Sequence, residues 1–275
     1  MLYVQFKRRN GEALGVGVSA WSVTVRRMHS DEGISRLVAA VRELDPKPRE
    51  RRWVSVSFCV LDAVYSIGAH YDNHVVPVVR RVAADFDVES PSVEMSVPEA
   101  ADPVPLDAFL DRYTSVEALV ETTKNRQNTS TRGGIRKADA VLRYAEMLRE
   151  HGVLTLDDAR RLLTDTVRLD AAESALRKVP GEGGAGVRRG YLWMLIGHQD
   201  TVKPDRMVLR WLARHGAETT PDSARLLLRD IAQVLSEETG RVVTAWEVDH
   251  AVWQAARTSS TATELSSREP ESGRT

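Results

Sequence analysis

Residues 176–210 read LRKVPGEGGAGVRRGYLWMLIGHQDTVKPDRMVLR, and this stretch decides the fold. One helical pattern ends at its start, and the turn VPGEG at 179–183 separates it from a second helix expected over residues 186–196. The two glycines of the turn free the backbone to approach a bulky ligand. The first amides of the second helix lack partners within the helix and lie at the positive end of its dipole, a setting that binds phosphate. The stretch therefore predicts a phosphate-binding turn between two helices.

The glycines of this turn do not indicate a dinucleotide site. The turn follows a helical pattern, whereas the Rossmann fingerprint follows a strand. The Gly-Lys-Ser/Thr ending of a P-loop is also absent from the sequence. Both common nucleotide-binding folds are therefore excluded for this turn.

Helical periodicity continues on both sides of the turn, and cap and breaker residues separate the apolar patterns. Thr155 and Asp158, for example, form a start that is similar to a capping box. The sequence thus predicts an all-α fold with no convincing sheet. The expected helices span residues 30–44, 55–69, 71–86, 115–123, 135–148, 156–163, 169–176, 186–196, 204–215, 223–235 and 246–256.

Residues 86–106 interrupt the helical pattern. They hold several acidic residues and prolines but no lysine or arginine. Such a composition is typical of a loop or a mobile excursion. Because its negative charge would repel a nucleic-acid backbone, we expect this acidic, proline-rich loop to lie away from any DNA-binding face.

The chain has 275 residues, of which 42% are hydrophobic, and this suits one large domain or two lobes that share a cleft. We expect the compact domain over residues 28–257. Residues 1–27 are expected to be an extension that is flexible or reflects a mis-assigned start, because glycine and serine interrupt its faint signal-peptide pattern. Residues 258–275 are rich in Ser, Thr and Glu and are expected to form a disordered tail.

The single cysteine and most tryptophans are expected inside the fold. Cys59 lies in an apolar run, where a small buried thiol is the usual finding. One cysteine excludes a disulfide within the chain, a four-cysteine iron-sulfur cluster and a cysteine-rich zinc site. Four tryptophans at helical positions are expected in the core or between lobes, namely Trp193, Trp211, Trp246 and Trp253.

No metal or organic cofactor is expected. The three histidines His198, His215 and His250 lack the convergent spacing of metal ligands. Binding of a monovalent cation at the hairpin turn is the one possibility that the sequence leaves open. No apolar run approaches the roughly 20 residues that cross a bilayer, so no membrane partner is expected. A cytoplasmic monomer is the resulting expectation.

The formal net charge of -1 hides an uneven distribution. A basic loop without acids covers residues 124–137, and its cations are Lys124, Arg126, Arg132, Arg136 and Lys137. A second basic group flanks the turn and consists of Arg177, Lys178, Arg188 and Arg189. Two basic clusters beside a phosphate-binding turn favour double-stranded DNA as the partner, contacted through its phosphates. The alternative is solvated arginine in a chain that is rich in this residue.

The turn and the residues after it resemble the helix-hairpin-helix (HhH-GPD) superfamily of base-excision DNA glycosylases. In that superfamily an apolar-Pro-Gly-x-Gly turn precedes a helix, a glycine and a catalytic Asp that opens the next helix. This chain has the turn at 179–183, a helix to Ile196, then Gly197 and Asp205. Residues 132–138 and 248–253 are similar to the superfamily's Gly-x-x-Arg-x-Lys-Ala helix start and closing Leu-Asp-x-x-Ile-Trp. The likeness covers roughly residues 54–257 and implies two helical lobes with the hairpin and Asp205 at the mouth of a cleft.

The resemblance implies a catalytic role for Asp205. Breaking an N-glycosidic bond builds positive charge on the sugar, which a nearby carboxylate stabilises while it orients or deprotonates water. The alternative is that Asp205, directly after Pro204, only supports a helix start. The DNA backbone is expected at the hairpin and its neighbours, namely Pro180, Gly181, Gly183, Gly184, Lys178, Arg188, Arg189 and Lys203.

Two departures from the superfamily matter. Its strand-cleaving members use a lysine just after the Gly-x-Gly, where this chain has Gly184 and Ala185, so a monofunctional enzyme without lyase activity is expected. The motif that fills the gap left by an extruded base is absent as well. His70 and Tyr71 lie near its position in the sequence, where they are expected either to insert into the duplex or stack on a base, or only to pack inside the protein. Two alternatives to a glycosylase therefore remain: a catalytically inactive DNA-binding module on the same scaffold, and a helical protein that binds a small molecule.

Overall fold

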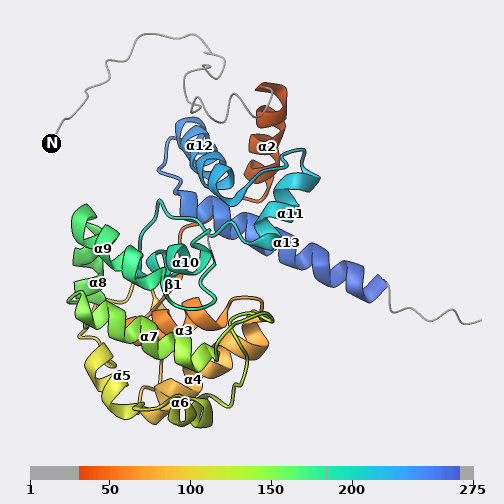
Figure 1. The fold of residues 1–275 in the computed structure, drawn as a ribbon. Helices are drawn as coiled ribbons and strands as arrows, with labels where there is room; N and C mark the ends of the chain where they lie inside the picture. The colour runs from red at the N-terminus through yellow and green to blue at the C-terminus, as the bar shows by residue number, and fades with distance from the viewer. Residues whose placement is uncertain (1–30, 184, 267–275) are drawn as a thin grey trace, which may run out of the picture.

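The structure is a computed structural model that describes residues 31–183 and 185–266 (Figure 1). The described chain is mostly helical, which confirms the predicted all-α class, and the predicted extension at residues 1–27 lies outside it. The helices are α2 (Asp31–Glu43), α3 (Val56–Tyr65), α4 (Val76–Asp85), α5 (Leu106–Arg112), α6 (Val116–Thr123), α7 (Lys137–Glu150), α8 (Leu156–Leu163), α9 (Thr166–Leu176), α10 (Val187–Ile196), α11 (Arg206–Arg214), α12 (Pro221–Thr239) and α13 (Ala245–Ser266), with the π-helical turn η1 (Tyr71–Val75) before α4.

Four elements differ from the sequence-based expectations. Strand β1 (Arg51–Trp53) pairs antiparallel with β2 (Ser92–Glu94). No sheet was expected, because three-residue strands are too short to show an alternating pattern in the sequence. Helix α5 begins where the loop at 86–106 was expected to end, and it buries Leu106 and Phe109. Helix α13 continues through residues 258–266 of the expected tail, where no Gly or Pro interrupts it.

The helices bury two separate hydrophobic clusters. Lobe one comprises β1 to α10, and its core includes Phe58, Tyr65 and Leu148. Lobe two combines α2, α11 and α12, at the top of Figure 1, with α13, which runs below them to the right. Its core includes Leu37 and Leu228. Lobe one is therefore a continuous stretch of chain, whereas lobe two joins both ends of the domain. Within the described ranges, no helix combines the length and the apolar character that a membrane span requires.

Helix α3 is the centre of lobe one. All of its residues are buried, and it packs against α4, α7 and α10. The Ser55 side chain caps its start by accepting a hydrogen bond from the Ser57 amide at 3.1 Å. A helix that is apolar on every side belongs in the interior, so the apolar sequence of α3 explains its place.

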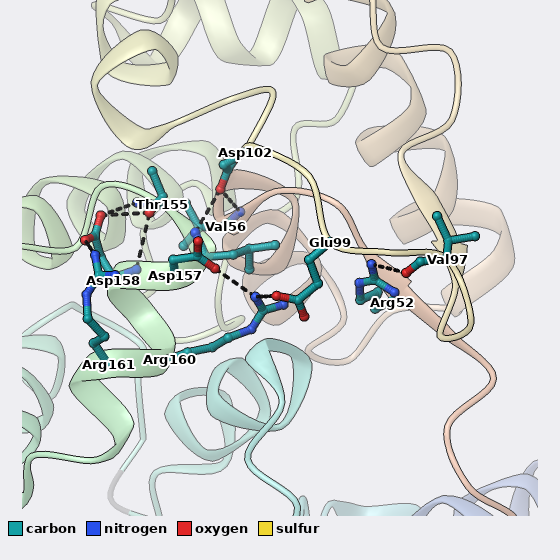
Figure 2. A network of polar contacts seen from close by, with 11 residues as sticks. Arg52, Val56, Val97, Glu99, Asp102, Thr155, Asp157, Asp158, Arg160 and Arg161 are labelled. Atoms are coloured by element: carbon teal, nitrogen blue, oxygen red, sulfur yellow. Dashed lines mark hydrogen bonds and ion pairs between the residues drawn. The ribbon is translucent and has the colours of Figure 1, made fainter.

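The acidic loop at 86–106 is hydrogen-bonded to lobe one (Figure 2). One Asp102 oxygen accepts hydrogen bonds from the amides of Val56 at 2.9 Å and Leu156 at 3.0 Å, so it caps the starts of α3 and α8 together. Its other oxygen accepts from the Val104 amide at 3.0 Å. Glu99 adds an ion pair with Arg160. Asp102 thus supplies an acceptor to two helix starts whose first amides would otherwise lack partners.

We expect Asp102→Ala to lower the free energy of unfolding by about 2 kcal/mol, because it leaves the first amides of two helices without an acceptor. Urea unfolding followed by circular dichroism measures this change. The control is Asp111→Ala, since Asp111 is exposed and its removal is expected to change stability by less than about 0.5 kcal/mol. Equal stability of the two variants would contradict the double-capping role.

Candidate functional site

A cleft of about 2750 Å³ opens between the lobes. Lobe one contributes the hairpin turn, part of the basic loop and the segment from Ser66 to Asp72. Lobe two contributes the residues around Asp205 and one face of α13. The cleft thus collects most of the segments that the sequence singled out.

The hairpin turn and the basic loop form one continuous surface. Thr129 lies against Gly181, so closely that a side chain at Gly181 would put a Cβ 2.1 Å from the Thr129 hydroxyl oxygen. Gly181 also has a φ of 80°, a conformation that favours glycine. The Thr129 hydroxyl accepts from the Ile135 amide at 3.2 Å, which closes the basic loop on itself. Two features therefore require glycine at position 181: the positive φ of its backbone and the close contact with Thr129.

The hairpin holds an internal carboxylate that the sequence did not reveal. The Glu182 side chain is 2% exposed and accepts hydrogen bonds from the Tyr144 hydroxyl and, at 3.3 Å, from the Arg189 amide. It forms ion pairs with Arg188 at 3.3 Å and Arg189 at 3.1 Å. Burial raises the pKa of Glu182. Part of the expected phosphate-binding start of α10 is thus occupied by the protein's own carboxylate.

Arg188 and Arg189 were expected to contact DNA, and the structure corrects this. Both are buried, with residue exposures of 1% and 4%. Arg188 also donates to the Gly181 carbonyl at 2.8 Å, and Arg189 to Glu173 at 2.6 Å. Both guanidinium groups are paired with carboxylates of the protein, and Arg188 also lines the cleft.

Two glycines of the turn are exposed, as a turn that approaches a ligand requires. Gly181 and Gly183 line the cleft, and neither amide finds an acceptor within the described part of the chain. Gly184 lies outside the described residues. Pro180 is half-buried, and Lys178 is exposed on the turn but does not line the cleft. Two glycines of the turn whose amides have no acceptor among the described residues therefore line the cleft, which is fewer free amides than the sequence suggested.

The basic loop divides into a buried and an exposed part. Lys137, expected to contact DNA, lines the cleft but is 2% exposed, and its ammonium donates at 2.8 Å to the carbonyls of both Tyr65 and Ile67. Burial lowers the pKa of Lys137 to about 8. Arg126 and Arg136 are exposed and line the cleft. The other two cations of the loop are exposed away from the lining, namely Lys124 and Arg132.

Asp205 caps α11 and lines the cleft. Its Oδ1 atom accepts from the amides of Met207 at 2.8 Å and Val208 at 3.1 Å, which confirms the helix-start interpretation. Its Oδ2 atom accepts no hydrogen bond from any residue that the structure describes. The residue is half-buried and belongs to the cleft lining. One oxygen is thus fixed by the helix, and the carboxylate still reaches the cleft.

Lys203 was expected to contact phosphate, but it lies enclosed between the lobes. Its ammonium sits 3.5 Å from the centre of the Tyr191 ring and donates to the Ser66 hydroxyl at 3.1 Å. Its amide donates to Asp249 at 3.2 Å. Burial lowers the pKa of Lys203 and raises the pKa of Asp249 to about 7. Lys203 therefore joins lobe two to lobe one.

His70 and Tyr71 differ in their surroundings. The Tyr71 hydroxyl donates to the buried Asp62 carboxylate at 2.8 Å, and its ring packs edge-on against Trp253 with 6.2 Å between the ring centres. Tyr71 therefore packs inside the protein. His70 is exposed and lines the cleft. Only His70 keeps the freedom that a wedge into a duplex requires.

An aromatic wall on α13, made of Trp246, His250 and Trp253, lines the cleft and was not predicted as functional. The His250 ring stacks on Trp246 at 4.8 Å and lies 6.0 Å from Trp253. The Arg49 guanidinium lies over the Trp246 ring, 4.6 Å from its centre, and the Arg257 guanidinium lies over the Trp253 ring, 5.2 Å from its centre. The spacing of these side chains on one helix face was visible in the sequence, but the open space beside it was not. Trp193 and Trp211 are buried, as expected.

Further placements complete the site. Asp87 and Glu89 line the cleft, so the expectation that the acidic loop lies away from it is wrong for these two residues. Cys59 is buried as expected, and burial raises the pKa of its thiol. Among the described residues, no group of three His, Cys, Asp or Glu side chains could hold a metal ion.

Comparisons with known proteins identify a family. A comparison with curated proteins found no match, and neither did a comparison with solved structures. A family described as "Domain of unknown function (DUF8548)" matches residues 32–257, which span both lobes and the cleft. The chain belongs to this family.

Proposed function

We propose that this protein binds double-stranded DNA and acts as a monofunctional DNA N-glycosylase of the base-excision repair type, with Asp205 assisting hydrolysis of the N-glycosidic bond. The observation that carries the proposal is the composition of one cleft: a half-buried carboxylate, two glycines of the hairpin turn and two exposed arginines of the basic loop all line it. A carboxylate in the same cleft as an anion-binding turn suits a substrate that is a polyanion and passes through a cationic transition state.

The reaction needs one carboxylate and one water molecule. As the bond between C1′ and the base nitrogen breaks, its electron pair leaves with the base and positive charge develops on the sugar. Asp205 stabilises that charge and accepts a proton from the water whose oxygen bonds to C1′, and the departing base takes a proton from solvent. Because Oδ1 is fixed by two amides, the carboxylate needs little reorganisation during the reaction.

The test is base release from a panel of duplexes, each with one damaged or mismatched base. Release by the wild-type protein that is lost in Asp205→Asn supports a glycosylase. No release from any duplex contradicts it. An expanded panel with single-stranded versions of the same oligonucleotides checks that the duplex is the substrate.

Duplex binding depends on the exposed cations of the cleft. We expect Arg126→Ala to reduce the steepness of the dependence of log Kd on log salt concentration by about one, because one phosphate contact is lost. Arg126 is exposed and lines the cleft, so the fold is not expected to change. Fluorescence anisotropy at several salt concentrations measures the slope. Arg149→Ala, an exposed arginine outside the cleft lining, is expected to leave it unchanged, and equal slopes for both variants would contradict this DNA face.

The second candidate is a DNA-binding module without chemistry. The observation in its favour is that Asp205 has a sufficient structural reason to be present, since it caps α11. This candidate predicts salt-dependent duplex binding that survives Asp205→Asn, together with no base release by the wild-type protein. Absence of binding at low salt would contradict both candidates.

A further inference from the structure

Lys203 brings a buried ammonium group to the cleft, next to Asp205. The residue is 9% exposed and lines the cleft. Its carbonyl accepts a hydrogen bond from the Asp205 amide at 2.6 Å, which closes a tight turn through Pro204 and keeps the two Cα atoms within about 7 Å of each other. Asp205 is the more exposed of the two residues. A ligand that touches the Asp205 carboxylate and extends further into the protein therefore meets Lys203.

The protein satisfies this ammonium group only in part. Its Nζ atom donates to the Ser66 hydroxyl at 3.1 Å and lies 3.5 Å from the centre of the Tyr191 ring. Among the residues that the structure describes, it forms no second hydrogen bond and no ion pair, and the nearby carboxylates act on its charge only from a distance. An ammonium group has three donors and no acceptor, so the site favours a ligand that supplies an acceptor.

The ring beside the ammonium group is fixed by a buried carboxylate. Asp62 is fully buried, and its Oδ2 atom accepts hydrogen bonds from the Trp53 indole and the Tyr71 hydroxyl, both at 2.8 Å. The Tyr191 hydroxyl lies 3.5 Å from the same oxygen. All three aromatic residues line the cleft. Lys203 is thus held against an ordered aromatic surface, which keeps its donors in place.

These surroundings suit a base rather than a phosphate. Phosphates of a duplex are bound by exposed cations such as Arg126 and Arg136, whereas Lys203 is enclosed by a ring and a hydroxyl. An enzyme that acts on a base takes it out of the duplex into a pocket, where its edge forms hydrogen bonds and its face packs on aromatic side chains. Because an ammonium group donates and cannot accept, it pairs with a carbonyl oxygen of that edge and opposes an amino group.

We propose that Lys203 selects the base: its ammonium group donates to a carbonyl oxygen on the edge of the extruded base, so the substrate carries a carbonyl group where adenine and cytosine carry an amino group. Hypoxanthine and uracil are the simplest bases of this class. The inference rests on the proposed function, because a base reaches this part of the cleft only after it has left the duplex. The matching amino base loses the hydrogen bond and is expected to bind about 10- to 100-fold more weakly.

The first test measures binding without chemistry. Two duplexes differ at one position, where one carries 2′-fluoro-deoxyinosine and the other carries 2′-fluoro-deoxyadenosine. Both carry an abasic analogue opposite this position, so neither base has to leave a pair, and the fluorine keeps the base attached because it disfavours positive charge on the sugar. Fluorescence anisotropy is expected to show about 10- to 100-fold tighter binding of the hypoxanthine duplex. Equal Kd values, or tighter binding of the adenine duplex, would overturn the proposal.

Two variants assign the preference to Lys203. Lys203→Met keeps the alkyl stem without a donor, and Lys203→Gln supplies both a donor and an acceptor, so each is expected to bind the two duplexes with nearly equal Kd. The matched control is Lys47→Met, since Lys47 also lines the cleft but is 65% exposed and pairs with Asp45 at 2.5 Å. The control is expected to keep the preference. A preference that persists in Lys203→Met, shown by circular dichroism to be folded, would overturn the proposal, and Lys203→Gln decides if Lys203→Met does not fold.

The second test separates base selection from catalysis. The same two duplexes with ordinary deoxynucleotides, together with the damaged and mismatched panel, are assayed for base release. Tighter binding of hypoxanthine without release from any duplex would support base selection and contradict the glycosylase. Release of other bases, combined with equal binding of the two fluorinated duplexes, would support the glycosylase and overturn base selection. Absence of binding to either duplex at low salt would contradict both.

Discussion

Asp205→Asn is expected to slow base release by about 10²- to 10⁴-fold while leaving the fold and duplex binding intact. The asparagine oxygen can still accept from the amides of Met207 and Val208, so α11 keeps its cap. The charge that stabilises the sugar cation and accepts the water proton is lost. Single-turnover release measures the effect, and fluorescence anisotropy with the same duplex measures binding.

The control for this prediction is Asp165→Asn. Asp165 caps α9 with its side chain, accepting from the Arg168 amide at 3.1 Å, and it lies outside the cleft lining. The two variants therefore remove the same charge from the same kind of helix position. Equal rates in both would show that Asp205 is only a cap.

Glu182→Ala is expected to lower the free energy of unfolding by about 3–5 kcal/mol, because it leaves the buried Arg188 without its carboxylate and removes one of the two carboxylates that pair with Arg189. Arg188 and Arg189 have side-chain exposures of 1% and 5%, so water cannot replace the lost partner without opening the hairpin. The Tyr144 hydroxyl also loses its acceptor. Urea unfolding gives the difference, and duplex binding is expected to weaken with it.

Glu150→Ala is the control for Glu182→Ala. Glu150 is an exposed glutamate at the end of α7, and its removal is expected to change stability by less than about 0.5 kcal/mol. If Glu182→Ala unfolds at the same urea concentration as Glu150→Ala, the ion pairs of the hairpin are not what stabilises it.

Local signals allowed most helices to be predicted. Helix α8 was expected at residues 156–163 and spans Leu156–Leu163, with the capping box of Thr155 and Asp158 in place. Such signals depend on residues within one or two turns of each other, so a single sequence contains them. The strand pair was missed for the opposite reason, since β1 and β2 are short and lie far apart in the chain.

The orientation of charged side chains could not be predicted in the same way. Arg188, Arg189 and Lys137 looked like parts of a basic surface, yet each is buried against a partner from elsewhere in the chain or from the hairpin itself. Whether a cation faces solvent depends on which distant acid or carbonyl group packs beside it. Arg126 and Arg136 carry the same charge in the same loop as Lys137, and they remain exposed.

The candidate site combines predicted and unpredicted residues. Asp205 and the hairpin glycines were placed by their spacing, and they do line one cleft. Asp249 and the aromatic wall were not, because their role depends on how α13 crosses the space between the lobes. The sequence shows that Trp246 and Trp253 share a helix face, but it does not show that this face lines a cleft.

The division of lobe two between the ends of the domain has a consequence for biosynthesis. Helix α2 leaves the ribosome long before α11, α12 and α13, with which it forms one core. Lobe one is contiguous and can complete its own core in the meantime. The amphipathic helix α2 must therefore stay unassembled until α11, α12 and α13 have been translated, and the cleft forms only once lobe two is complete.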